Sequence, residues 1–203
     1  MVALSEVADQ VRSRPTPHGL RIVGVDGPSG SGKTTLAARL AALTGASVIP
    51  IDDFLSWQHL ADWWPRFDAQ VLHPLTTGHD AHYQARDWSD WHGDTLGEWT
   101  TVPWSPLVII EGVTSTRAAA GNRLAYRIFV DAPPDLRLSR GLNRDGEQHR
   151  ELWQDWMRRE DAFFEADQTR DRADLRVDPD TTPSDDNTDR ETGPTGPATP
   201  TAG

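Results

Sequence analysis

The sequence predicts an α/β fold of three layers, in which a parallel sheet of about five strands lies between layers of helices. Two observations indicate this fold. A strand-like apolar segment, Leu20–Val25, leads into a glycine-rich run, and a helix-forming segment, Leu36–Leu43, follows directly. A later segment, Leu107–Ile110, is apolar throughout, as a parallel strand is when helices cover both of its faces. Ligands of such sheets bind where the strands end, so the residues after each strand are the candidates for chemistry.

The glycine-rich run has the spacing G-x-x-x-x-G-K-[ST] of a phosphate-binding loop, the P-loop. Its glycines let the loop curl until its N–H groups form a nest for an anion, which the N-terminus of the next helix continues. Lys33 is then placed to reach the β- and γ-phosphates of a nucleotide, and the Thr34 hydroxyl to ligate Mg²⁺. A dinucleotide-binding G-x-G-x-x-G does not fit, because Thr35 stands where its third glycine should be. The run predicts the P-loop NTPase fold, with nucleotide contacts from Gly27, Ser29, Gly30, Ser31, Gly32, Lys33, Thr34 and Thr35.

Composition favours one domain and argues against several kinds of partner. A hydrophobic content of 36% in 203 residues is enough for one buried core. The formal net charge of −11 argues against a nucleic-acid partner. There are no cysteines, which excludes disulfides and thiolate metal sites. No apolar run has the length of a signal-peptide core or a membrane-spanning helix, so we expect a cytoplasmic protein without a membrane partner.

The chain divides into a helical extension at 1–19, a domain at 20–178 and a tail at 179–203. Leu4–Arg12 has near-helical spacing and is closed by Pro15 and Pro17, and we expect it to pack against the sheet edge. The tail is acidic and rich in proline and threonine, and it contains no Leu, Ile, Val or aromatic residue. Such a segment buries too little surface to offset its chain entropy, so we expect it to be disordered.

Two further strands are expected to bring carboxylates to the ligand-binding edge of the sheet. Ser47–Ile51 reads as a short buried strand that ends in Asp52 and Asp53, which makes both candidates for chemistry. Leu107–Ile110 ends in Glu111, which fits a Walker B-like role at a magnesium ion; the alternative is a carboxylate that caps the segment from Thr114 onward. We expect an alanine-rich helix after Glu111, and then a strand at Tyr126–Asp131.

The region between these strands shows less pattern. A helical turn or two is expected around Asp68–His73, ended by Pro74. The segment Asp80–Pro106 is polar, aromatic and irregular, and it either covers a substrate or forms a tryptophan-rich flap packed on the core. The histidines lack a regular ligand spacing, which argues against a zinc site.

Three arginines, Arg137, Arg140 and Arg144, are spaced to share one face of a helix. The residues alone leave two interpretations open, a solvated face that pairs with nearby acids or an anion clamp over transferring phosphates. The next helix, about Glu147 to Asp167, carries an apolar stripe typical of core, and Leu175–Val177 adds a last short strand.

The order of these features, from about residue 20 to 177, resembles the uridine kinase, phosphoribulokinase and pantothenate kinase group of P-loop kinases. It is most similar to small bacterial uridine kinase-like proteins. The matching positions are Val25-Asp26-Gly27, Asp52-Asp53, Asp87-Trp88, Glu111-Gly112-Val113, Arg144-Asp145-Gly146 and, less specifically, Arg172-Ala173-Asp174.

The resemblance implies an ATP- and Mg²⁺-dependent kinase that transfers the γ-phosphoryl group to a hydroxyl of a small molecule, with a nucleoside as the favoured acceptor. It implies that Asp52 is the general base or orients the acceptor, that Glu111 and Thr34 hold Mg²⁺, and that Arg144 belongs to a mobile lid at about 137–150. This favours the clamp interpretation, in which Lys33, Arg140 and Arg144 neutralise the transferring phosphates.

The acceptor side departs from the uridine kinase pattern. We expect it to include Asp53, Arg86 and Asp87, but Leu55 and Arg86 stand where uridine kinases have tyrosines. An arginine in place of a tyrosine argues against uridine itself and favours an anionic acceptor. The alternatives are therefore a nucleoside monophosphate kinase, in which Arg86 and Arg140 read the acceptor phosphate, and an ATP-binding regulatory module with little turnover. The oligomeric state is not predicted.

Overall fold

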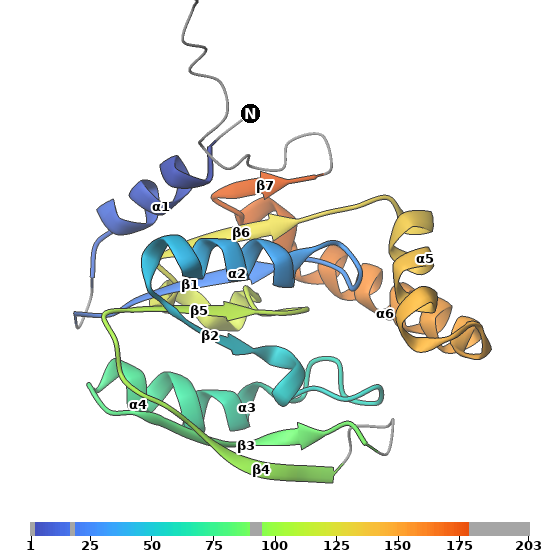
Figure 1. Ribbon diagram of the computed structural model, residues 1–203, viewed down its shortest axis with the longest axis horizontal. Coiled ribbons are helices and arrows are strands. Elements are labelled where there is room, and N and C mark those ends of the chain that lie inside the picture. Colours follow the sequence, from blue (N-terminus) through green and yellow to red (C-terminus); the bar gives the residue numbers. More distant parts are fainter. Residues whose placement is uncertain (1–2, 17–18, 90–94, 179–203) are drawn as a thin grey trace, which may run out of the picture.

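The computed structural model describes residues 3–16, 19–89 and 95–178, and its centre is a five-stranded parallel sheet (Figure 1). The strands are β1 (Arg21–Asp26), β2 (Ser47–Pro50), β5 (Leu107–Glu111), β6 (Tyr126–Val130) and β7 (Leu175–Val177). Their order across the sheet is β2-β5-β1-β6-β7, and every neighbouring pair is parallel. The predicted α/β fold, with its sheet of five strands, is confirmed.

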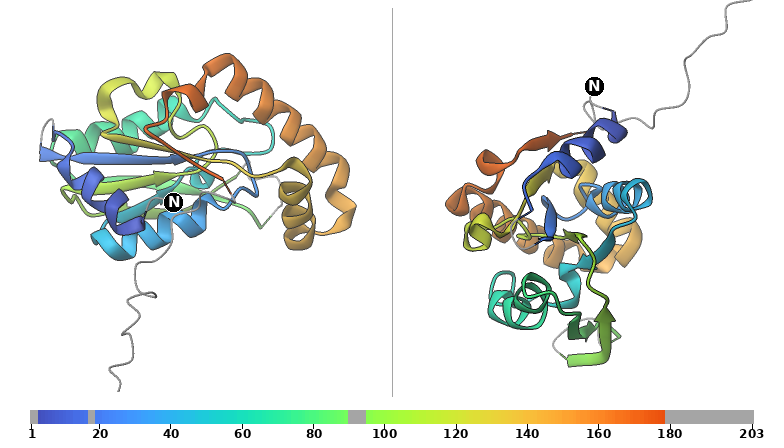
Figure 2. Two further views of the ribbon diagram at one scale, coloured as in Figure 1. Left: turned by 90° about the horizontal axis from the view of Figure 1, so that it is seen from above. Right: turned by 90° about the vertical axis from the view of Figure 1, so that its left-hand side faces the viewer.

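Helices cover both faces of this sheet (Figure 2). On one face, α1 (Leu4–Ser13) and α2 (Lys33–Thr44) pack on the alternate side chains Val23, Val25 and Ile109. On the other face, Ile22, Val108 and Ile110 pack with α6 (Arg150–Asp167) and with the helical segment that begins at α3 (Trp64–Phe67). The alternation follows from the pleat of each strand, which sends successive side chains to opposite faces. These are the three predicted layers.

The extension before β1 joins the same core. Leu4, Val7, Ala8 and Val11 of α1 are buried. Gln10 accepts a 2.6 Å hydrogen bond from the Tyr126 hydroxyl of β6, so α1 lies toward the β6–β7 edge of the sheet, as predicted. The tail at 179–203 and Pro17 lie outside the described residues, and the domain boundaries stay a prediction.

The prediction that Asp80–Pro106 is irregular is wrong. This segment contains the antiparallel pair β3 (Ala81–Asp87) and β4 (Thr95–Val102), which forms a second, two-stranded sheet. Ala81, Tyr83 and Val102 are buried against the main core. The strand pattern was hard to see because the register shifts between Gln84 and Arg86, which breaks the alternation of buried and exposed side chains.

Two helix predictions also need correction. Pro74 does not end the helical segment, which runs through α3 (Trp64–Phe67), a π-helical turn at Asp68–Leu72 and α4 (His73–Thr76). In this π-turn the His73 N–H donates to the Asp68 carbonyl, five residues back, and Pro74 follows in the first turn of α4, where a proline is tolerated. The alanine-rich segment forms only two short 3₁₀ turns within Ala118–Arg123, because Gly121 between them has non-helical angles (φ 55°, ψ −135°).

At the carboxyl ends of the strands stand α5 (Pro134–Asp145) and the start of α6, joined by a 3₁₀ turn at Glu147–His149 (Figure 1). The helix predicted from about Glu147 therefore begins as an α-helix at Arg150. Within the described residues, no helix combines the length and the apolarity needed to cross a membrane.

Candidate active site

The predicted polar groups meet at the carboxyl edge of the sheet because of the strand order. The P-loop follows β1, Glu111 ends β5, and Asp52 lies in the 3₁₀ turn Ile51–Asp53 directly after β2. Since β5 lies between β1 and β2, its carboxylate stands between the loop and Asp52. Segments that lie up to about 80 residues apart in the sequence thus form one site.

The P-loop is shaped by contacts that only glycine permits at two positions. Gly27 has φ 137°, and a Cβ there would lie 2.0 Å from the Val130 carbonyl oxygen. Gly30 has φ 77°, and a Cβ there would lie 2.7 Å from the Arg137 carbonyl oxygen. The loop is therefore packed closely against the end of β6 and the start of α5, and its backbone conformation is fixed by its surroundings.

Asp26, at the end of β1, joins the loop to the chain after β5. Its fully buried carboxylate accepts hydrogen bonds from the Gly27 N–H (2.6 Å), the Thr114 N–H (2.8 Å) and both the N–H (2.7 Å) and the hydroxyl (2.9 Å) of Thr116. Burial raises the pKa of Asp26 to about 6, although the hydrogen bonds from Thr116 and Gly27 and the Lys33 ammonium favour the charged form. Asp26 therefore holds the first residue of the P-loop in place.

Lys33 and Thr34 lie at the first turn of α2, facing Glu111. The buried Lys33 ammonium donates to the Pro28 carbonyl at 2.9 Å, across the mouth of the loop. The Thr34 hydroxyl donates to the Glu111 carboxylate at 3.3 Å. Burial and the nearby Asp52 raise the pKa of Glu111, while Lys33 lowers it.

This donor set fits Mg²⁺. A hydroxyl and a carboxylate supply two oxygen ligands side by side, and Mg²⁺ at phosphate sites takes its other ligands from phosphates and water. Among the described residues, no cluster of three or more His, Cys, Asp or Glu side chains forms a cage for a metal. Thr34 and Glu111 thus lie side by side, as a shared Mg²⁺ site requires, and their role as its ligands stays a prediction.

Two pockets meet at Asp52. The first, of about 530 Å³, is the phosphate pocket, which is lined by the P-loop from Ser29 to Thr35 and by Glu111, Arg140 and Arg144. The second, of about 360 Å³, is the tryptophan pocket, which is lined by Trp57, Trp88, Trp153 and Trp156 together with Asp52, Asp53, Leu55, Arg144 and Asp145. Both pockets are lined by Ser29, Asp52, Val113, Arg144 and Trp153. A group bound in one pocket is therefore next to a group bound in the other.

The three arginines of α5 have three different surroundings. Arg137 is 3% exposed and pairs with Glu160 at 3.5 Å and with Asp161 at 3.6 Å, so it stabilises the packing of α5 on α6. Arg140 donates to the Gly30 carbonyl of the P-loop at 2.8 Å. Arg144, which lines both pockets, forms two hydrogen bonds with Asp145, at 2.7 and 2.9 Å, and these raise its pKa. Only Arg140 and Arg144 are thus placed for a phosphate clamp.

The acceptor-side predictions separate into two groups. Asp53 lines the tryptophan pocket, where the Tyr83 hydroxyl donates to its carboxylate at 2.8 Å and burial raises its pKa. Arg86 and Asp87 line neither pocket. Arg86 Nε donates to the Phe54 carbonyl at 3.2 Å, and the exposed Asp87 accepts from the Ser89 N–H, which lowers its pKa. The structure does not bring these two residues to the site.

The sequence interpretation missed four site residues: Trp57, Trp153, Trp156 and Glu160. Glu160, fully buried on α6, accepts hydrogen bonds from the Ser29 N–H (2.9 Å), the Ser29 hydroxyl (2.5 Å) and the Trp156 indole (2.6 Å). Burial raises its pKa, and Lys33 and Ser29 oppose that shift. The sequence did contain a signal for Glu160, because this acid lies within the apolar stripe of a helix. A charged side chain that is buried in this way usually has a partner, so Glu160 could have been expected to hold another residue in place.

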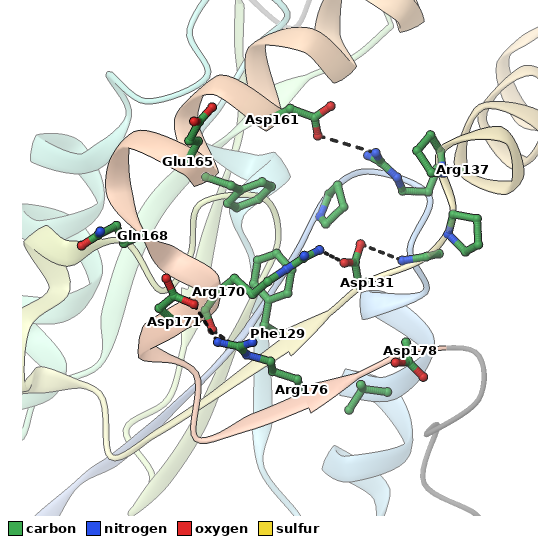
Figure 3. Close-up of a pocket in the computed structure, with 16 residues that line it drawn as sticks. Phe129, Asp131, Arg137, Asp161, Glu165, Gln168, Arg170, Asp171, Arg176 and Asp178 are labelled. Carbon is green, nitrogen blue, oxygen red and sulfur yellow. Dashed lines mark hydrogen bonds and ion pairs between the residues drawn. The ribbon is translucent and has the colours of Figure 1, made fainter.

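A larger cavity, of about 1050 Å³, lies between the end of β6, α5, α6 and β7 (Figure 3). Most of its charged side chains pair with one another: Arg137 with Asp161, Arg170 with Asp131, and Arg176 with Asp171. The carboxylates at the strand ends, Asp52 and Glu111, do not line it. The candidate catalytic groups at the carboxyl edge of the sheet therefore line the two smaller pockets and not this cavity.

Comparisons with known proteins find distant relatives. The chain matches no profile of a known protein family. It is 24% identical to the uridine kinases of Borrelia duttonii and Borrelia recurrentis over 140 residues, which cover 62% of this chain and 68% of each relative.

Solved structures with the same fold include a possible uridine kinase from Bacillus stearothermophilus. It has a TM-score of 0.64 at 22% identity, over 86% of this chain and 97% of that one. A candidate fructose transport system kinase from Silicibacter sp. TM1040 also has a TM-score of 0.64, at 21% identity, over 87% of this chain and 99% of that one. The chain thus has the P-loop kinase fold and resembles uridine kinases in sequence, as predicted.

Proposed function

We propose that this protein is a small-molecule kinase, which uses ATP and Mg²⁺ to phosphorylate a hydroxyl group in the manner of uridine kinases. The observation that carries the proposal is the position of Asp52, which lines both the phosphate pocket and the tryptophan pocket. A carboxylate at the junction of two pockets is suited to orient an acceptor hydroxyl toward a γ-phosphate and to accept its proton.

The other residues have consistent roles. The P-loop amides, Lys33 and Arg140 bind and orient the phosphates, and Arg144 reaches the junction from α5. Mg²⁺, held by Thr34 and Glu111, would neutralise charge that develops on the transferring group. Because phosphoryl transfer has a loose transition state, positioning and charge neutralisation account for most of the rate.

The tryptophan pocket favours an acceptor without a phosphate group. Its described charged side chains are Asp52, Asp53, Asp145 and Arg144, and Arg144 is engaged by Asp145. A nucleoside monophosphate would face this excess of negative charge, and Arg86 lies outside the pocket. A hydroxylated acceptor of nucleoside or sugar size is therefore the better candidate.

The proposal is tested by ADP release from Mg-ATP across a panel of nucleosides, sugars, nucleoside monophosphates and other alcohols, with Asp52→Asn beside the unmutated protein. We expect an unphosphorylated acceptor to stimulate turnover, and Asp52→Asn to lower kcat by about 10²- to 10⁴-fold, the usual contribution of general base catalysis. ATP binding should persist in the variant. Tight ATP binding without stimulation by any acceptor would instead indicate a nucleotide-binding regulatory module.

A further inference from the structure

The four tryptophans of the tryptophan pocket form a box. Trp57 is nearly perpendicular to the other three: to Trp88 at 89°, to Trp153 at 78° and to Trp156 at 79°, with ring centroids 6.5, 5.9 and 5.1 Å away. Trp57 lies in the loop after β2, Trp88 directly follows β3, and Trp153 and Trp156 lie on α6. The fold thus assembles this box from three separate segments.

Three of the indole N–H groups are already used within the protein. Trp88 donates to the Asp52 carbonyl at 3.1 Å, Trp153 to the Asp145 carboxylate at 3.0 Å, and Trp156 to Glu160 and to the Ser29 hydroxyl. Arginines of the protein already lie over two of these rings, Arg144 over Trp153 at 5.6 Å and Arg159 over Trp156 at 5.4 Å, as expected of aromatic faces that carry partial negative charge. The Trp88 ring, over which no arginine of the described residues lies, can present its face to a ligand. A cation is the group that such faces attract most strongly.

The charged side chains around the box also favour a cationic ligand. Asp52 and Asp53 are neighbouring carboxylates that both line the pocket, and burial, followed by repulsion from Asp52, raises the pKa of Asp53. Arg144 is engaged by Asp145, and Arg66 donates to the main-chain carbonyl of Asp53 at 2.8 Å without lining the pocket. A positive charge brought by the ligand would relieve this repulsion.

We propose that the acceptor is a hydroxylated compound that carries a protonated amine or quaternary ammonium group, held in the tryptophan box beside Asp53 while its hydroxyl lies at Asp52. The inference rests on the proposed kinase function and narrows its acceptor class. About 360 Å³ of pocket volume accommodates an amino alcohol, an amino sugar or an aminated nucleoside.

The test compares acceptors that differ in charge and little else. Choline is paired with 3,3-dimethylbutan-1-ol, its uncharged isostere, and glucosamine is compared with glucose and glucuronate; uridine serves as a neutral nucleoside. For each compound kcat/KM is measured by ADP release, and the dissociation constant is measured by calorimetry in the presence of Mg-ADP. We expect the cationic member of each set to be preferred by at least about 10-fold, as one or two cation–π contacts and an ion pair allow, and glucuronate to be the poorest hexose.

Asp53→Asn is the variant that addresses the mechanism, and Asp155→Asn, on an exposed part of α6, is its matched control. The cation-to-neutral ratio should fall about 5-fold or more in Asp53→Asn and stay unchanged in Asp155→Asn. Ratios near one in the unmutated protein, or a preference for uridine over every cation, would overturn the inference and leave the kinase proposal standing.

Absence of turnover with every compound would count against the kinase proposal alone. The dissociation constants then decide the inference: tighter binding of choline and glucosamine than of their neutral partners supports it, and equal binding overturns it. Because this comparison needs only the unmutated protein, it remains decisive if Asp53→Asn fails to fold.

Discussion

The phosphate pocket and the tryptophan pocket share Asp52 but are built in different ways. The loop of the phosphate pocket is backbone from one continuous run, Ser29 to Thr35, whose shape is fixed by glycines and by the buried Asp26, and residues of other segments complete the lining. The tryptophan pocket is made of side chains from segments about 30 to 100 residues apart. A site made of backbone requires a particular local sequence, whereas a site made of side chains can be assembled from many sequences.

Because of this difference, we expect the two pockets to respond differently to amino-acid substitutions. In the phosphate pocket a single added methyl group meets the backbone of another element, which has little freedom to move. In the tryptophan pocket each side chain is one of several that share a function, so the loss of one is graded. The following predictions test that contrast.

Gly27→Ala is expected to have the largest effect. The new Cβ would lie 2.0 Å from the Val130 carbonyl oxygen, at φ 137°. Backbone strain and overpacking together should lower the free energy of unfolding by about 4 kcal/mol. The matched control is Gly32→Ala, which also has positive φ (107°) but no atom within 4 Å of the new Cβ, and it should cost about 2 kcal/mol from strain alone. Urea unfolding measures both, and equal losses would show that the close packing of the loop is not what fixes it.

The pH dependence of stability should reveal Asp26. Its pKa is raised from 3.8 to about 6, so the folded protein holds this proton more tightly than the unfolded chain. The corresponding stabilisation is fully present below about pH 4 and is lost as the pH rises through 6, a change of about 3 kcal/mol. Urea unfolding between pH 4 and 7 should therefore show a steeper loss in the unmutated protein than in Asp26→Asn. Identical slopes would mean that the four donors around Asp26 keep it ionised at its ordinary pKa.

Glu160 joins the two pockets, and Glu160→Gln should affect turnover more than binding. Its carboxylate holds Ser29, which lines both pockets, and it contacts Trp156 of the box and Arg137 of α5. Glutamine keeps the size but loses the charge that balances Arg137 and Lys33. We expect kcat to fall about 30-fold while the KM for ATP changes less than about 3-fold, as misplacement near a reacting group does.

The control is Glu151→Gln, at an exposed position of the same helix. Assays run well below the unfolding midpoint separate this effect from simple destabilisation. A rise in both KM values with an unchanged kcat would identify Glu160 as a packing residue only. The pH profile of kcat gives a second readout, because the variant should lose any acidic limb that arises from Glu160.

The same contrast explains how much the sequence predicts. The P-loop, the strands that end in Asp52 and Glu111 and the parallel sheet are readable because each depends on local pattern, and the structure places them as expected. The hairpin of β3 and β4 was missed because a register shift between Gln84 and Arg86 breaks its alternation. Trp153 and Trp156 were read as core, and both are indeed buried; their role as a pocket wall depends on Trp57 and Trp88, which come from other segments. No spacing within one segment encodes that arrangement.

A substitution of Arg86 is expected to have the smallest effect, and it tests directly how well sequence position predicts a residue's role in the site. Its sequence position favours acceptor binding, but in the structure its Nε donates to the Phe54 carbonyl and the residue lines neither pocket. Arg86→Met should therefore change the KM for the acceptor by less than about 2-fold, with a loss of about 1 kcal/mol of stability from the missing hydrogen bond. Trp88→Ala, two residues along the chain and in the pocket wall, should raise that KM about 5-fold, the value of one lost aromatic contact. If Arg86→Met had the larger effect, the acceptor would extend beyond the tryptophan box toward β3, and the pattern in the sequence would have been the better guide than the pocket.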